Sequence, residues 1–425
     1  MLAILCRKLV YECAELGDRT ANAFSSRGLN EFCMALQQSN KAYIIAARRT
    51  ALGRIGGLHG TRRIEALAAP VISAALSDAD VTASEVDEII VGNATAGGNP
   101  ARLIALASGL PETANATTID QQDASGLVAI IQASRLIAQG DADVVVAGGA
   151  ESLSTAPWRI ASPKNVHQMP RFIHPDPFST AGFNLPFPLE CTEKLAQDLN
   201  ISRARQEAFA ASSLQKAVDA RKAKRFDEEI VAMKARREEA RDQSTASAEL
   251  AEFQEEEPYL EENGTLTPAN TCTWHDGAAF VVLVSEQKWQ DLGQTAALSL
   301  IASASVGVPP GDESSAPIAS VKKLYKRLNG FDRSTITVLE TSETSAAQAI
   351  ALAEALGFDE TAINPEGGAL ARGHPFGAAG AVLVVRLFSQ LIRTNSKTKP
   401  AHAVATQGAL GGLGVAALFS SETQT

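Results

Sequence analysis

Short apolar runs that end on glycine alternate along this chain with segments of helical periodicity, and this alternation restricts the possible folds more than any other feature. The runs predict buried strands at residues 41–47, 86–92, 117–121, 142–149 and 278–284. Helical spacing is found at 64–76, from 99 onwards and at 127–139. Strands that alternate with helices in this way form a mainly parallel sheet with both faces covered. The pattern therefore predicts an α/β fold.

Two segments interrupt the alternation. Residues 154–270 are first rich in Pro, His and Phe and then in charged residues, and the acidic run 238–262 within them is typical of a solvated helical face or loop. We therefore expect 154–270 to be an inserted loop domain. Residues 1–40 contain no persuasive strand, and Met34 is a possible alternative start, so these residues are treated as an extension of doubtful structure.

The C-terminal part of the chain repeats the pattern of the N-terminal part. The predicted strand 335–340 corresponds to 86–92, and residues 363–391 correspond to the strand, turn and helix of 118–139. Residues 401–405, with the glycine cluster after them, correspond to 144–149. The repeat predicts two duplicated α/β halves, formed by residues 41–153 plus 271–290 and by residues 291–425.

Composition and charge exclude several classes of protein. A net charge of −10 and a pI near 5.3 argue against nucleic acid or an anionic membrane as the main partner. No apolar run approaches about 18 residues, so we expect no membrane span. The cysteines are odd in number and include no CxxC pair, which is typical of a reduced, cytoplasmic protein without a disulfide framework or metal site. They are Cys6, Cys13, Cys33, Cys191 and Cys272.

One histidine lies in a turn rich in glycine and alanine, within residues 364–380. Gly373 and Gly377 flank His374, and because glycine lacks a Cβ atom the backbone there can approach a ligand closely. The proline after the histidine suits the first turn of the apolar helix predicted at 381–391. We expect this turn to direct open backbone N–H groups and the imidazole toward one point, as a developing oxyanion requires. A plain tight loop is the alternative interpretation.

Five short motifs, this histidine turn among them, stand in a characteristic order. They are Arg49-Thr-Ala-Leu-Gly53, Gly98-Asn-Pro-Ala-Arg102, Val146-Ala-Gly-Gly-Ala-Glu-Ser152, Asp276-Gly-Ala-Ala279 and Gly373-His-Pro-Phe-Gly377. From about Tyr43 to its C-terminus the chain therefore resembles the thiolase family. The resemblance implies a five-layered αβαβα fold of two duplicated halves, with a loop domain inserted in the first. It also implies an acetyl-CoA acetyltransferase or 3-ketoacyl-CoA thiolase of lipid metabolism, acting on acyl-CoA by Claisen condensation or its thiolytic reverse.

The catalytic set that the resemblance implies is largely replaced in this chain. Thiolases use a nucleophilic cysteine at a helix N-terminus, the histidine of the Gly-His-Pro turn, a second cysteine, and an asparagine that holds a water in the oxyanion hole. His374 matches the histidine. Asp123 stands at the nucleophile position, Gly408 at the second-cysteine position and Ser342 at the asparagine position. The active site thus resembles a degenerate one in which Claisen and thiolytic chemistry is lost.

The positions expected to bind substrate also depart from the family. Cys272 stands where the family has a serine that touches the pantetheine arm, and Phe187 where it has a loop-domain histidine. We also place at the substrate four residues of the histidine turn and the glycine cluster: Gly373, Phe376, Gly411 and Gly412. The expected ligand is a CoA thioester, without a further cofactor or a metal. The expected partner is a second copy of the chain, in a homodimer or homotetramer paired near 117–121, or a heteromeric catalytic subunit.

Several interpretations of Asp123 stay open. Asp is a favoured helix N-cap as the anion, and a cap here would mark lost chemistry. Asp123 and His374 could instead form an acid–base pair for hydrolysis, decarboxylation or retro-aldol cleavage of an acyl-CoA. A thiolase reaction by another route is a third interpretation, and a non-catalytic acyl-CoA-binding or scaffold subunit is the non-enzyme alternative. Cys191, Cys272 and Ser125 are not favoured as nucleophiles.

Overall fold

The computed structural model describes residues 41–163, 165, 167–172, 188–233, 240–244, 256–260, 262–309, 311–394 and 401–424. The chain divides into two compact units, Met1–Asn40 and Lys41–Thr425. The predicted extension 1–40, Phe187 and most of the acidic run 238–262 lie outside the described residues.

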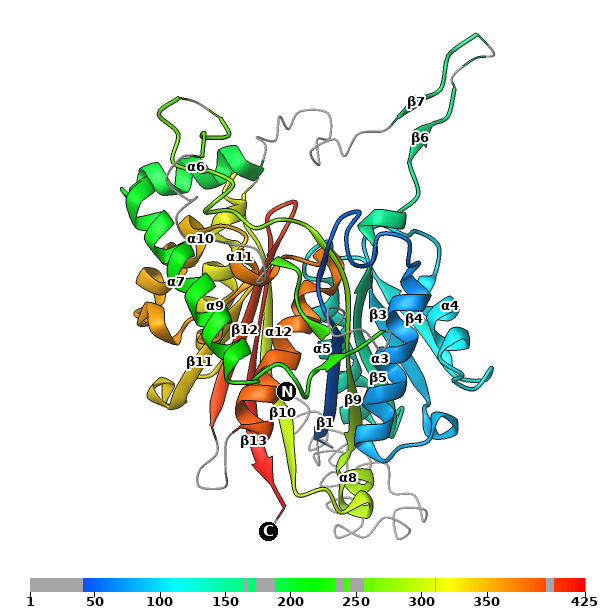
Figure 1. Cartoon of the computed structure of the whole chain (residues 1–425). Coiled ribbons are helices and arrows are strands. Elements are labelled where there is room, and N and C mark those ends of the chain that lie inside the picture. Colours follow the sequence, from blue (N-terminus) through cyan, green and yellow to red (C-terminus); the bar gives the residue numbers. More distant parts are fainter. Residues whose placement is uncertain are drawn as a thin grey trace, which may run out of the picture. The chain divides into compact units, whose positions relative to one another are not determined.

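The N-terminal half contributes five neighbouring strands to one sheet, in the order β4-β3-β5-β9-β1 (Figure 1). Strands β3, β4 and β5 run parallel, whereas β9 lies antiparallel to both β5 and β1. Their bounds are β1 Ala42–Thr50, β3 Glu88–Gly92, β4 Asn115–Ile119, β5 Val144–Glu151 and β9 His275–Ser285. Strands β5 and β9 are buried along their whole length, which explains why they appear in the sequence as continuous apolar runs.

The C-terminal half repeats this order with four strands. Strand β11 runs parallel to β12, β12 antiparallel to β13, and β13 antiparallel to β10, as β3, β5, β9 and β1 do in the first half. The bounds are β10 Ala296–Gly307, β11 Ile336–Thr341, β12 His402–Ala409 and β13 Leu413–Thr423. Among the described residues the counterpart of β4 is a single bridge between Leu339 and Ile363. The predicted duplication is confirmed, although the strand expected near residue 363 is reduced to that bridge.

Helices cover the strands in three layers, so that the fold has five. Helices α3 and α4 share one apolar core with the outer face of the N-terminal strands, and α9 and α10 share another with the outer face of the C-terminal strands. Helices α5 and α12 contact each other and strands of both halves, and so form the middle layer (Figure 1). The bounds are α3 Ile64–Ala79, α4 Pro100–Ala107, α5 Ser125–Gln139, α9 Ala316–Arg327, α10 Ala346–Leu356 and α12 Ala379–Phe388.

The two central helices approach closely because glycines lie between them. A Cβ atom on Gly126 would stand 2.9 Å from the backbone nitrogen of Ala381, and one on Gly380 would stand 2.6 Å from that of Leu127. Real Cβ atoms essentially never come within 3.0 Å of such an atom, so neither position has room for a side chain. A side chain at either position would therefore separate the helices, whose N-terminal ends carry the candidate site.

The loop domain is inserted between the neighbouring strands β5 and β9. Its helices α6 (Pro188–Asp198) and α7 (Arg203–Lys222) pack on α10 of the C-terminal half. Short strands pair elsewhere: β8 (Ile230–Val231) with β1, and β6 (Ile160–Ala161) with β7 (Arg171–Phe172). The remaining elements are β2 Gly53–Arg54, α8 Glu286–Leu292 and α11 Ala369–Arg372.

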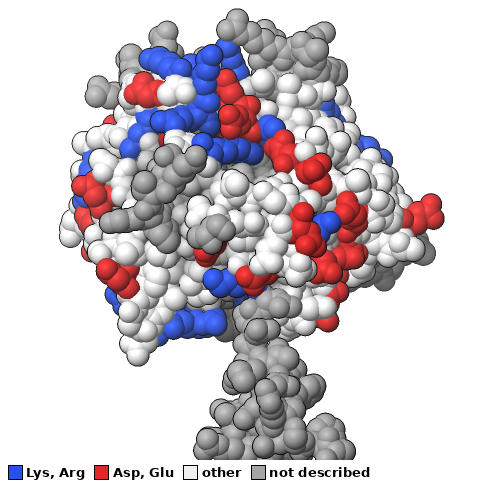
Figure 2. Space-filling view, turned by 90° about the horizontal axis from the view of Figure 1, so that it is seen from below, with Lys and Arg blue, Asp and Glu red and all other residues white. Residues whose placement is uncertain are grey.

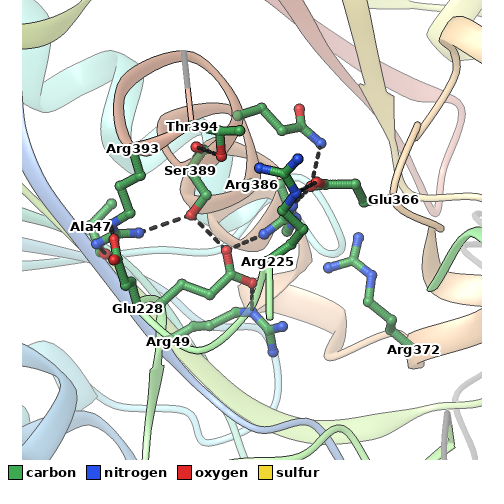
Figure 3. A network of polar contacts seen from close by, with 12 residues as sticks. Ala47, Arg49, Arg225, Glu228, Glu366, Arg372, Arg386, Ser389, Arg393 and Thr394 are labelled. Carbon is green, nitrogen blue, oxygen red and sulfur yellow. Dashed lines mark hydrogen bonds and ion pairs between the residues drawn. The ribbon is translucent and has the colours of Figure 1, made fainter. Parts of the chain in front are cut away.

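A buried ionic network ties the loop domain to both halves (Figure 3). Glu229 accepts from Arg49 of β1 at 2.8 Å and from Arg386 of α12, and Ser389 Oγ donates to it at 2.7 Å. Asp242 accepts two hydrogen bonds from Arg49, at 2.6 and 2.9 Å. Asp242 belongs to the acidic run predicted to be solvated, and at this residue the prediction is wrong. The carboxylate is buried because it neutralises the buried Arg49.

One helical stretch, Phe376–Arg393, is long and apolar enough to cross a membrane by length and composition. It includes α12, and 83% of it is buried inside the fold. Its apolar character follows from its place in the middle layer, where it meets α5 and strands of both halves.

Candidate active site

Asp123 and His374 meet where the two central helices begin. Asp123 precedes α5 of the N-terminal half, and His374 precedes α12, the equivalent helix of the C-terminal half. His374 Nε2 lies 2.8 Å from Asp123 Oδ1, and Leu410 N–H donates to Asp123 Oδ2 at 3.2 Å. Both side chains are buried, with 7% of Asp123 and 1% of His374 exposed. The duplication of the fold therefore brings together two residues 251 positions apart in sequence.

These contacts determine how protons are shared at the site. A carboxylate only accepts hydrogen bonds, so His374 must carry a proton on Nε2 when Asp123 is ionised. Asp123 then receives a donor on each oxygen. His374 Nδ1 is buried and has no hydrogen-bond partner among the residues that the structure describes. The pair is thus arranged as an anion held by two donors.

The interpretation of Asp123 as a helix cap is wrong. The N-cap of α5 is Ala124, and no side chain caps the helix by a hydrogen bond. Ser125 occupies the turn instead, since its Oγ accepts from Gln121 N–H at 2.8 Å and donates to the Gln122 carbonyl. The Asp123 carboxylate is directed across to the C-terminal half, where His374 and Leu410 hold it.

Three backbone N–H groups of the turn around His374 already donate to acceptors within the protein. The N–H of His374 donates to the Thr273 carbonyl at 2.9 Å, that of Gly377 to Glu151 at 3.2 Å, and that of Ala378 to the carbonyl of Pro375 at 2.8 Å. The expectation of open N–H groups at this turn is therefore wrong for these three donors. They fix the turn, and the imidazole is the group that it presents.

Glycine is required immediately before the histidine. Gly373 has a φ of +97°, and a Cβ atom there would stand 2.3 Å from the ring of His275. His275 Nδ1 lies 2.9 Å from the Thr273 carbonyl and its Nε2 lies 2.7 Å from Ser244 Oγ. His275 therefore supports the turn from behind, and burial lowers the pKa of its imidazole.

Glu151 fixes the other side of the same turn. Besides Gly377 it accepts from Asn93 Nδ2 at 2.7 Å, from Ala94 N–H at 3.0 Å and from the hydroxyl of Thr95. Burial raises the pKa of this carboxyl to about 7, although the four donors counteract that effect. Glu151 lies in a motif quoted above, but the motif did not reveal that it anchors the turn carrying His374.

Gly408, at the second-cysteine position, lies on β12 two residues before Leu410. A Cβ atom there would meet Pro317 Cδ at 3.2 Å, so a small side chain fits only if the proline ring gives slightly. Gly411 donates its N–H to Glu313 at 3.0 Å. Gly411 and Gly412, with φ of 86° and 75°, form the connection from β12 to β13. The glycine cluster therefore positions the Leu410 N–H that holds Asp123.

Ser342, at the asparagine position, is buried, and its Oγ has no hydrogen-bond partner among the described residues. Glu343 beside it accepts from Ser213 Oγ at 2.7 Å and adopts a φ of 47°. Burial raises the pKa of Glu343, while the bond from Ser213 acts in the opposite direction. The short Ser342 hydroxyl thus stands where the resemblance implies the longer side chain of an asparagine. The neighbouring Glu343 carboxyl is held by Ser213 of the loop-domain helix α7.

Cys272 is a half-buried free thiol on the segment that runs into β9. Burial raises the pKa of this thiol, and the negative charges of Asp123 and Glu343 raise it further. A thiol so disposed is poorly suited to act as a nucleophile, because the thiolate is the reactive form. Cys191 is buried, and burial raises the pKa of its thiol to about 11.

The structure therefore brings two of the predicted positions, Asp123 and His374, into direct contact. Contacts link Asp123 to His374 and to the Gly408–Gly412 segment, and electrostatic interaction links it to Cys272. Phe187 lies outside the described residues. Among the described residues no group of three or more His, Cys, Asp or Glu side chains is placed to hold a metal ion.

Two family domains match this chain. The thiolase N-terminal domain matches residues 42–287, and the thiolase C-terminal domain matches residues 294–421. The junction falls between β9 and β10, where the structure passes from one half to the other.

Named relatives and solved structures agree with these matches. A Staphylococcus epidermidis protein named "Putative acetyl-CoA C-acetyltransferase VraB" is 35% identical over 381 residues, which are 88% of this chain and 97% of that protein. The protein of that name from Staphylococcus aureus is 33% identical over 386 residues, 90% of this chain and 99% of its own.

Two crystal structures superpose closely on this chain. The acetyl-CoA acetyltransferase of Bacillus anthracis has a TM-score of 0.81 at 28% identity and covers 91% of this chain and 100% of its own. The Acat5 thiolase of Ascaris suum in complex with coenzyme A has a TM-score of 0.81 at 29% identity, with coverage of 90% and 100%.

Proposed function

The chain belongs to the thiolase family as an acetyl-CoA acetyltransferase-like protein, and on that premise we propose that it binds acyl-CoA thioesters but performs no Claisen or thiolytic chemistry. The observation that carries this proposal is the pairing of Asp123 with His374 at 2.8 Å. At the position of the family's nucleophile the chain holds a carboxylate whose two oxygens both accept hydrogen bonds.

A carboxylate held in this way is a poor substitute for a thiolate. Attack on a thioester by Asp123 would give a mixed anhydride. A mixed anhydride differs far more in free energy from the starting thioester than a second thioester does. The two donors also stabilise the anion and so lower its nucleophilicity. Without a cysteine at Gly408 and an asparagine at Ser342, the covalent route lacks its acid–base partner and its oxyanion support.

Binding of the CoA group itself rests on parts of the fold that are intact. The sequence keeps the Gly-His-Pro turn and the glycine cluster Gly411–Gly414, and the Ascaris suum relative with this fold is a complex with coenzyme A. On the face drawn in Figure 2, acidic side chains lie directly beside the basic ones, so that the basic side chains form no large area of their own. A CoA ligand, which needs few cations, suits such a surface better than a nucleic acid does.

The test is titration calorimetry with CoA and acetyl-CoA, combined with an assay of free CoA release from a panel of thioesters. We expect a dissociation constant in the high micromolar range or weaker, because the acidic run 238–262 offers few cationic contacts to the phosphates of CoA. We expect no CoA release above the buffer rate. Absence of any binding would refute the acyl-CoA part of the proposal.

A non-thiolytic hydrolase or lyase is the second candidate, and the direct contact between Asp123 and His374 favours it. A carboxylate backed by an imidazole can take a proton from a water or from the substrate. In that case the wild type should release CoA or cleave its substrate, and both Asp123→Asn and His374→Ala should abolish the activity. A purely binding or scaffold subunit would show no turnover in any of the three proteins.

We also propose that the chain forms homodimers or homotetramers in the cytoplasm. Strand β4 ends the sheet and is only partly buried, so its free edge can pair with a second copy of itself about a two-fold axis. Light scattering at micromolar concentration should give about twice the chain mass of 44.6 kDa, or a multiple of it. A monomer would contradict the proposal, and cell fractionation checks the compartment.

A further inference from the structure

Trp274 lies beside the buried pair of Asp123 and His374 and is half exposed. It forms an isolated parallel bridge with His374, in which His374 N–H donates to the Thr273 carbonyl and His275 N–H donates to the His374 carbonyl, both at 2.9 Å. Residues paired across two neighbouring extended chains project to the same face. The indole of Trp274 and the imidazole of His374 therefore lie on one face of this short ribbon.

Neighbouring residues place two further side chains on that face. Successive side chains of an extended segment alternate between its faces, so Cys272 projects to the same side as Trp274. The effect of the Asp123 charge on the pKa of the Cys272 thiol is consistent with this placement. Phe376, two residues after His374, contacts the Trp274 ring, with centroids 5.9 Å apart and the planes tilted by 46°.

The side chains assigned to this face differ in exposure. Asp123 is 7% exposed, Cys272 is half-buried and Trp274 is 51% exposed. Phe376 is buried beneath the indole, at 8% exposed. The exposed indole, with the Phe376 ring against it, is therefore the part of this group of side chains that faces the solvent.

We infer that Trp274 and Phe376 form a subsite for a planar, ring-bearing acyl group of a CoA thioester. This inference rests on the proposed function, in which the chain binds acyl-CoA. An indole that leaves half its surface exposed while its neighbour holds it in place offers a flat apolar face, and aromatic rings stack on such a face in offset or tilted arrangements. We place the acyl group here, and not another part of the ligand, because Trp274 is the bridge partner of His374 and the thioester would lie at His374. The adenine of CoA lies at the far end of the pantetheine arm from the thioester.

The test compares four ligands by titration calorimetry on the full-length protein: CoA, acetyl-CoA, phenylacetyl-CoA and the phenylacetyl thioester of N-acetylcysteamine. The last carries the ring without the adenine. We expect phenylacetyl-CoA to bind about three- to tenfold tighter than acetyl-CoA, the range that an aromatic contact provides. Trp274→Leu should remove this preference, whereas Trp158→Leu, at another exposed tryptophan, should keep it.

The outcomes separate this inference from the proposed function. Equal affinities for acetyl-CoA and phenylacetyl-CoA overturn the inference and leave acyl-CoA binding standing. If Trp274→Leu weakens CoA and acetyl-CoA as much as phenylacetyl-CoA, the indole stacks on adenine and the acyl subsite is refuted. If the N-acetylcysteamine thioester binds in a Trp274-dependent way while no CoA compound binds, the subsite stands and the proposed function falls. Binding of none of the four refutes both.

Discussion

Acetoacetyl-CoA thiolysis is expected to be absent in the wild-type protein and to stay at trace level in Asp123→Cys combined with Gly408→Cys. The first substitution restores a thiol within reach of His374 Nε2, which lies 2.8 Å from the present carboxylate. The second adds a thiol on β12, where the Cβ atom must displace the ring of Pro317 slightly. Ser342 still lacks the amide of the oxyanion position, and losing one such donor costs about 10²–10³ in rate.

The sharpest version of this experiment adds Ser342→Asn to the double variant. If the three replacements account for the lost chemistry, the triple variant should exceed the double variant by about two orders of magnitude. Asp123→Ala is the matched control, since it removes the carboxylate without supplying a thiol. Robust wild-type thiolysis that disappears in Asp123→Ala would refute the loss of chemistry and make Asp123 a working catalytic residue.

Glu229→Ala is expected to destabilise the protein by about 3–5 kcal/mol, because removing one partner from a buried ionic network leaves Arg49 and Arg386 each with one carboxylate fewer. Glu229 accepts from Arg49, from Arg386 and from Ser389, and it is fully buried. Its removal leaves two buried guanidinium groups each short of a partner. Arg49 keeps Asp242 and Arg386 keeps Glu366 as partners, but the hydrogen bonds that Glu229 accepted are not replaced.

The measurement is chemical denaturation followed by circular dichroism. Glu354→Ala provides a matched control, because Glu354 pairs with Arg205 at 2.6 Å on the surface, where such pairs contribute about 0–1 kcal/mol. Equal losses of stability in Glu229→Ala and Glu354→Ala would contradict the assignment of the network as an essential link between the halves and the loop domain.

The same carboxyl predicts a pH dependence. Burial alone would raise the pKa of Glu229, but the charges of Arg386 and Arg49 outweigh it and lower that pKa to about 2. A carboxyl whose pKa is lower in the folded state than in the unfolded chain stabilises the fold above the unfolded value. Its contribution should be fully present above about pH 5 and be lost as the pH falls toward 2. Glu229→Ala should therefore lose less stability than the wild type over that window.

The sequence alone determined the fold and the positions of the site. The continuous apolar runs of β5 and β9 identified buried strands, since a strand covered on both faces consists mainly of apolar residues. The repeat of strand order predicted the duplication, and the ordered motifs predicted the family. Asp123 and His374 each precede one of two equivalent helices of the duplicated halves, α5 and α12, and this equivalence is visible in the sequence.

The tertiary structure decided what those residues do. Local propensity favours Asp123 as a helix cap, but its carboxylate instead pairs with His374 and Leu410, which lie in the other half of the chain. Asp242 lies in an acidic run yet is buried, because a buried arginine from β1 needs an anion. Trp274 belongs to none of the sequence motifs. It lies beside His374 because an isolated bridge joins two segments that are distant in sequence. Such contacts join residues that are far apart in sequence, and the local sequence around a residue does not predict which distant residue it will contact.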